Sequence, residues 1–319
     1  MKREEMAPAH VRAGWWVLIL SVALVWVVAA QAGAAETAPR TKAEIQTLLN
    51  EAQEGNPDAM FSVGVLTLSG HLKGLSRKDA VKLIEAAASA GKPEAAYLAG
   101  SLYLKGDAVE KDAERATTFY RLAADAGHAG AQTALAQSYL KGEGVAKDEG
   151  EARLWLEKAA AQGFPAAQLN LGVLYVSGAG GMHNPERGAE LISQAANRGL
   201  VEAQHNLAWI YQEGKAGPAD LQRARQWYLR AAEQGYQPAQ FNLGLLHLRR
   251  QGGLTDPVEA MKWMMLAASG ADPVFKKKAG DAVATIAKNL NQSQVAAAGK
   301  AAREWAKLRQ AGQAEKVVQ

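Results

Sequence analysis

Two serine and lysine pairs have the spacing that a serine nucleophile could use. Ser89 with Lys92, and Ser138 with Lys141, both fit the S-x-x-K pattern, in which one helical turn brings a lysine amine beside a serine hydroxyl. A lysine in that place can activate the serine for attack on a carbonyl group. Neither S-D-N nor K-T-G, the elements that complete such sites, accompanies either pair. We therefore predict that both pairs are coincidental and that the protein is not an enzyme.

The sequence also lacks the motifs of metal-binding and phosphate-binding sites. No two histidines are four residues apart and none lies in an H-E-x-x-H motif; they are His10, His71, His128, His183, His205 and His247. The glycine-rich segment from Ser177 to Asn184 follows no strand and lacks a G-x-x-x-x-G-K-[ST] motif. There is no cysteine, which excludes zinc-thiolate sites, cysteine nucleophiles and disulfides. We predict no cofactor and no bound metal.

Two columns of amide side chains are the remaining candidates for function. They recur at intervals of 36 residues, one as Asn170, Asn206 and Asn242 and the other as Gln168, Gln204 and Gln240. Asparagine is unfavourable inside helices, so its recurrence at one helical position indicates a structural or binding role. One hypothesis is a ladder of amides that donate to and accept from the backbone of an extended partner peptide. The alternative is that each asparagine ties its own helix to the next repeat.

The elements that carry these amides are themselves repeated. The segments Ala152–Tyr175 and Ala224–His247 are identical at 13 of 24 positions, and small residues keep the same interval along the chain. The alanine column is Ala95, Ala131, Ala167, Ala203 and Ala239; the glycine column is Gly127, Gly163, Gly199 and Gly235.

Each 36-residue repeat contains two amphipathic helices. Apolar residues recur at i, i+3, i+4, i+7 and i+8 in segment 152–160, and with similar spacing in 167–175. A glycine-bearing loop joins the two helices, and Gly163 is placed as the C-terminal cap of the second helix. Methyl-sized side chains let helices approach closely, and three tryptophans are expected to fill the space between layers: Trp155, Trp227 and Trp263. Because one helix pair cannot bury its apolar face alone, we predict an all-α solenoid of about six repeats.

This pattern divides the chain into four parts. Residues 1–35 are predicted to be a signal peptide and residues 36–55 an N-terminal capping helix that opens with a capping box at Thr41 and Glu44. Residues 56–273 hold the six repeats. Residues 274–319 leave the repeat pattern, and we expect two capping helices there, roughly Phe275–Leu290 and Gln292–Arg309, followed by a tail.

The N-terminal segment has the anatomy of an export signal. Basic residues precede an apolar run, and small residues offer cleavage sites after Ala32, Ala34 or Ala35. The alternative is an uncleaved anchor, because residues 13–32 are long enough to form a membrane tether. In either case the repeats are expected on the far side of a membrane.

Charge gives little reason to expect a nucleic-acid partner. The chain carries a formal net charge of +4, and the excess is concentrated between Phe275 and Gln319, which hold nine Lys/Arg against three Asp/Glu. A nucleic-acid site should place basic residues along the folded face. We therefore interpret the basic end as a solvated helical surface.

The repeat resembles the Sel1-like repeats, relatives of the tetratricopeptide repeats. The family pattern A-x-x-x-L-G-x-x-Y-x-x-G-x-G-V-x-x-D-x-x-x-A-x-x-W-x-x-x-A-A-x-x-G is matched by residues 95–127 and 131–163. The chain departs from it at Ala136 and Ala208, which replace a glycine, and at Gly188, which replaces an alanine. It also lacks the disulfides that clamp some secreted members.

The resemblance implies a right-handed α-solenoid with the first helix of each repeat on the concave side. It further implies an adaptor that binds one or more proteins or peptides, here a periplasmic or secreted one in a bacterium. One alternative is an adaptor anchored in the inner membrane and facing the periplasm. A second is a β-lactamase or peptidoglycan hydrolase, because some secreted members carry that label; the missing catalytic constellation argues against it.

Overall fold

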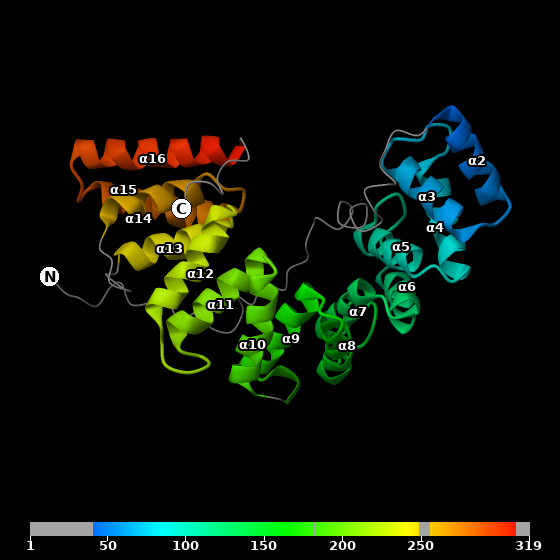
Figure 1. The fold of residues 1–319 in the computed structure, drawn as a ribbon, viewed down its shortest axis with the longest axis horizontal. Helices are drawn as coiled ribbons and strands as arrows, with labels where there is room; N and C mark the ends of the chain where they lie inside the picture. Colours follow the sequence, from blue (N-terminus) through cyan, green and yellow to red (C-terminus); the bar gives the residue numbers. More distant parts are fainter. Residues whose placement is uncertain (1–40, 182, 249–255, 311–319) are drawn as a thin grey trace. The chain divides into compact units, whose positions relative to one another are not determined.

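The protein is helical throughout the part of the chain that its computed structural model describes, residues 41–181, 183–248 and 256–310 (Figure 1). No strand occurs in these ranges, which confirms the predicted all-α fold. The predicted signal peptide or anchor, residues 1–35, lies outside the described residues. Within them, no helix is both long enough and apolar enough to span a membrane.

The described residues form two compact units, unit 1 up to Asn170 and unit 2 from Leu171, with the boundary inside α9 (Pro165–Ser177). The other helices of unit 1 are α2 (Lys42–Gln53), α3 (Pro57–Leu68), α4 (Arg77–Ser89), α5 (Pro93–Lys105), α6 (Ala113–Asp125), α7 (Ala129–Lys141) and α8 (Glu149–Ala161). Those of unit 2 are η1 (Ala179–Gly181), α10 (Pro185–Asn197), α11 (Val201–Glu213), α12 (Leu221–Glu233), α13 (Gln237–Leu248), α14 (Pro257–Ala268), α15 (Pro273–Ala287) and α16 (Gln292–Gln310).

Within each unit the helices pack in chain order. The first helix of a repeat lies against its second helix, as α5 does on α6 and α11 on α12. The second helix then packs on the first helix of the next repeat, as α6 does on α7 and α12 on α13. This is the nearest-neighbour packing of a solenoid.

Small side chains permit this packing. All five members of the alanine column are completely buried: Ala95, Ala131, Ala167, Ala203 and Ala239. Gly188, which replaces an alanine of the family pattern, faces a second glycine. A Cβ atom at Gly188 would lie 2.6 Å from the carbonyl oxygen of Gly172, so a methyl group is too large where α10 meets the C-terminal part of α9.

A column of acidic and amide residues starts the second helices. The side chain of Asp112 accepts a hydrogen bond from the backbone N–H of Arg115 at 2.9 Å, and equivalent residues repeat this N-cap in the later repeats. The equivalents are Asp148, Asn184, Asp220 and Asp256. The capping box predicted for the first helix is also present, because Thr41 and Glu44 bond each other's backbone N–H. The chain thus satisfies the free N–H groups of its helix starts locally.

The glycine column ends the second helices. Gly127, Gly163, Gly199 and Gly235 have φ values of 87°, 77°, 89° and 76°. This left-handed conformation follows the last helical turn, where glycine avoids the steric cost that a Cβ atom would bring.

The three tryptophans of the repeats differ in how far the neighbouring helices bury them. Trp155 and Trp263 are buried, whereas Trp227 is half-exposed. A cation covers each ring, with Lys158 Nζ 3.8 Å from the Trp155 ring centre and Arg230 Cζ 4.5 Å from that of Trp227. These cation–π contacts shield aromatic surface that the helices leave open.

Two helices close the C-terminal side of unit 2. Both α15 and α16 pack on α14, at nearly the bounds predicted from the sequence (Figure 1). Ile286 of α15 and Ala298 of α16 join Met264 in one buried cluster. Trp305 of α16 meets Trp263 edge to face, with ring centres 5.9 Å apart. The last repeat therefore buries its apolar face under these helices.

Candidate partner-binding site

The glutamine column lies inside the packing of the repeats. Gln204 and Gln240 are buried, and their Nε2 atoms donate to the carbonyl oxygens of Ala196 and Ala232 at 3.3 and 3.2 Å. Gln204 also accepts a hydrogen bond from Gln234 at 2.8 Å. Gln168 is buried as well. These contacts join consecutive helices, so they favour the bracing interpretation for the glutamines, while a role in partner binding stays a prediction.

The asparagine column is split between the two units. Asn170 is buried in unit 1, and Asn206 and Asn242 are half-buried in unit 2. His205, which no sequence pattern singles out as a site residue, connects the latter two. Asn242 Nδ2 donates to His205 Nε2 at 3.0 Å, and His205 Nδ1 lies 3.4 Å from Asn206 Oδ1.

These contacts define the protonation state of His205. Because Nε2 accepts from an amide N–H, the ring proton is on Nδ1 and points at the carbonyl oxygen of Asn206. The rings of Tyr228 and Tyr236 flank the imidazole, each with its centre 5.4 Å away. Burial lowers the pKa of His205 to about 4, so the ring is neutral at pH 7. A neutral imidazole thus holds the two asparagines in fixed orientations.

Acid should therefore destabilise unit 2. A histidine whose pKa is lowered from 6.5 to about 4 by folding contributes stability above pH 6.5, and this contribution disappears as the pH falls toward 4. At pH 4.5 we expect a loss of about 2–3 kcal/mol of unfolding free energy relative to pH 7.5. Burial also lowers the pKa of His247, which adds an effect of the same sign.

Urea unfolding followed by tryptophan fluorescence, at pH 7.5 and 4.5, measures this loss. The variant His205→Gln should lose much less stability on acidification, whereas His183→Gln, at an exposed position of the same unit, should behave like the parent. Equal pH dependence in all three proteins would contradict the assignment.

A half-buried strip of aromatic and amide groups includes this bridge. On α11, His205, Asn206 and Trp209 lie within about one turn of one another, and on α13 Phe241 and Asn242 are adjacent. We call these five residues the amide–aromatic face. Phe241 is held by an edge-to-face contact with Phe275 of α15, with ring centres 5.8 Å apart. Aromatic side chains with fixed polar groups beside them are the composition from which protein-binding surfaces are built.

The serine and lysine pairs are not arranged for nucleophilic chemistry. Ser89 Oγ donates to the carbonyl oxygen of Glu85 at 2.9 Å, and Lys92 Nζ lies 2.5 Å from a carboxylate oxygen of Asp58. In the other pair Ser138 is buried and Lys141 is exposed. The structure therefore brings neither lysine amine to its serine hydroxyl.

Stacked helix pairs of constant length define a helical-repeat solenoid, and comparison with known proteins identifies its kind. A profile described as the Sel1 repeat matches six consecutive segments, which together cover more than half of the chain: residues 57–92, 93–128, 129–164, 165–200, 201–236 and 237–272. The chain belongs to the Sel1 repeat family. Proteins of this family generally bind other proteins. No curated protein matches the chain in sequence.

The chain also resembles solved structures. The chain is similar to a Sel1 repeat protein from Oxalobacter formigenes, with a TM-score of 0.64 and 28% identity over 79% of this chain and 98% of the other. A protective antigen of uropathogenic Escherichia coli, c5321, which displays the same repeat fold, is 26% identical with a TM-score of 0.41, over 81% of this chain and 62% of its own. The first of these supports the solenoid fold directly.

Proposed function

We propose that the protein is an exported, non-enzymatic scaffold that binds a protein or peptide through the amide–aromatic face of unit 2. The observation that carries the proposal is the bridge of His205 between Asn206 and Asn242. It fixes polar groups beside Trp209 and Phe241, so little side-chain freedom is lost when a partner binds. The amides can serve an extended backbone as both donors and acceptors.

Export is proposed from the sequence of residues 1–35. The cleaved and the anchored forms differ in the first residue of the mature protein. N-terminal sequencing of protein purified from its host distinguishes them: a start at residue 33, 35 or 36 supports cleavage, and an intact start supports the membrane anchor.

A photo-crosslinking amino acid tests the proposed face. Placed at Trp209, it should capture a discrete partner in the native host, whereas placed at Gln226, an exposed position on α12, it should not. With the purified partner, Trp209→Ala should weaken binding by about tenfold, because aromatic side chains are frequent hot spots. Melting curves of both variants check that the fold is kept. Identical crosslinked products at the two positions would contradict the proposal.

A further inference from the structure

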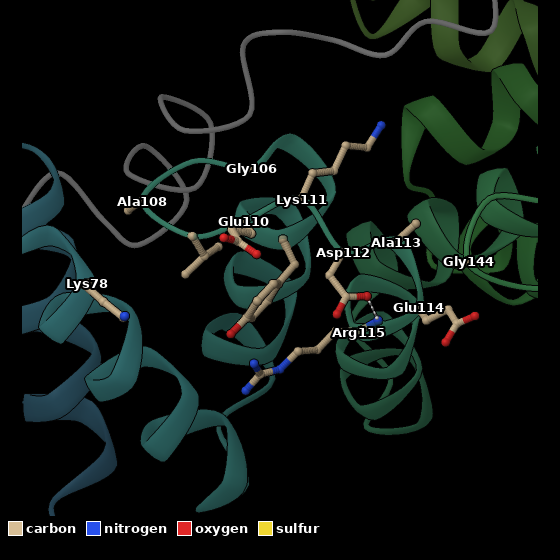
Figure 2. Close-up of a pocket in the computed structure, with 12 residues that line it drawn as sticks. Lys78, Gly106, Ala108, Glu110, Lys111, Asp112, Ala113, Glu114, Arg115 and Gly144 are labelled. Carbon is tan, nitrogen blue, oxygen red and sulfur yellow. Dashed lines mark hydrogen bonds between the residues drawn. The ribbon is translucent and has the colours of Figure 1, made fainter.

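An open groove lies in unit 1, whereas the amide–aromatic face belongs to unit 2. The loop of residues 106–112 between α5 and α6 forms one wall, and Lys78 of α4 reaches in from the other side (Figure 2). Its volume is about 1030 Å³, and Tyr103 and Arg115 are among the residues that line it. None of the residues considered from the sequence as candidate sites lines it.

The side chain of Arg115 is held by two contacts, with Glu85 and with Tyr103. Its Nη2 atom lies 2.8 Å from Glu85 Oε1, and its guanidinium carbon lies 4.4 Å from the centre of the Tyr103 ring. The hydroxyl of Tyr103 donates to the same Glu85 oxygen at 2.5 Å, and the tyrosine ring stacks on Phe119. Half of the Arg115 side chain stays exposed. A guanidinium fixed in this way keeps N–H groups available for a planar, bidentate acceptor.

The charges that face the groove favour an anion. Lys78 makes no ion pair among the described residues, and the first turns of both α4 and α6 border the groove with their positive ends. Lys111 and Glu114 also line the groove, but their side chains extend away from those of Lys78 and Arg115 (Figure 2). Asp112 is occupied as the N-cap of α6. Glu110 also lines the groove, and its carboxylate is neither turned away from it nor used as an N-cap (Figure 2).

The equivalent place one repeat later has the opposite charge. Tyr139 occupies the position of Tyr103, but Glu114 replaces Lys78 and Glu151 replaces Arg115. Arg121, which is the equivalent of Glu85 one repeat later, contacts Tyr139. Two later repeats keep an arginine in the column of Arg115, as Arg187 and Arg223, but Gly150 and Glu186 stand there in the place of Lys78. The combination of Arg115 with Lys78 is therefore particular to this groove.

We propose that the groove binds a carboxylate group of a partner protein, held between Arg115 and Lys78. This inference rests on the proposed function, because it names the chemistry by which unit 1 recognises a protein partner. The carboxylate can be the C-terminus of a chain or the side chain of an acidic residue. A ligand of this class accepts two N–H donors from Arg115 and neutralises Lys78.

Peptide titration followed by NMR of the ¹⁵N-labelled full chain tests the proposal. Three probes are used: N-acetyl-hexaglycine with a free C-terminus, the same peptide as its C-terminal amide, and an amidated hexapeptide with one central glutamate. We expect amide shifts in residues 106–112 with the first or the third probe, and at least about tenfold weaker binding of the uncharged amide. Whichever of the two charged probes binds more tightly identifies the source of the carboxylate. Equal binding of all three probes, or no shifts in this loop with either charged probe, would overturn the proposal.

Charge variants give effects of opposite sign that a structural role would not produce. Arg115→Gln and Lys78→Gln should each weaken binding by about three- to tenfold, and Glu110→Gln should strengthen it by about threefold. Arg223→Gln is the matched control, since Arg223 lies over Tyr211 in unit 2 as Arg115 lies over Tyr103, with 5.5 Å between its guanidinium carbon and the ring centre. The proposal fails if Glu110→Gln weakens binding or if the control matches Arg115→Gln. Because the probes are synthetic, this result is independent of whether crosslinking at Trp209 finds a partner.

Discussion

Replacing Gly144 by alanine is expected to destabilise unit 1 by about 3 kcal/mol, because overpacking and a left-handed backbone act together. A Cβ atom at this position would lie 2.0 Å from the carbonyl oxygen of Ala113 and 2.7 Å from the hydroxyl of Thr117. Gly144 also has φ +73°, which side chains rarely adopt. The loop from α7 to α8 must therefore move away from α6, and the hydrogen bond from Thr117 Oγ1 to the Glu143 carbonyl, 3.2 Å long, should be lost.

The same loop position one repeat earlier supplies the control. Ala108 has φ 64° although it carries a side chain, so Ala108→Gly should stabilise the unit by about 1 kcal/mol. Urea unfolding of the parent and both variants measures the two effects. A loss below about 1 kcal/mol for Gly144→Ala would mean that the loop shifts at little cost, which the contact with the Ala113 backbone argues against.

The repeated part of the structure could be predicted from the sequence because every repeat must meet its neighbours in the same way. Residues that face another helix are held to one size at a 36-residue interval, as Ala131 and Ala167 are. Residues at helix ends are held to one conformation, as Gly127 and Gly163 are. Such positions reveal helix bounds, stacking order and capping helices. The column of acidic and amide residues that includes Asp112 recurs just as regularly in the sequence. Its N-cap role could have been predicted from its place before each second helix.

The candidate sites could not be predicted in this way, since they are built from residues that differ between repeats. The ion pair of Arg115 with Glu85 joins residues 30 apart, and the bridge from His205 to Asn242 joins residues 37 apart. Both depend on the register of side chains on neighbouring helices, which helical spacing alone does not provide. Spacing likewise placed Gln204 on one helical face but could not tell that a neighbouring helix covers it.

Ending the chain at Asp272 should unfold the last repeat of unit 2. Without α15 and α16, the buried side chains of α14 would be exposed to water: Met261, Trp263, Met264 and Leu266. At about 1.5–3 kcal/mol for each large apolar side chain, the loss is of order 6 kcal/mol or more. This equals much of the total stability of a small domain, so α13 and α14 should lose their protection together.

Hydrogen exchange measured residue by residue separates this effect from a general loss of stability. In the shortened chain the amides of α13 and α14 should exchange much faster, whereas those of α5 to α7 in unit 1 should keep their rates, because a solenoid repeat is stabilised mainly by its nearest neighbours. The double variant Lys300→Gln with Lys307→Gln removes charge from exposed positions of α16 and should leave the protection of α14 unchanged. If the charge variant instead reproduced the truncation, the apolar cluster around Met264 would not be what holds the end of unit 2.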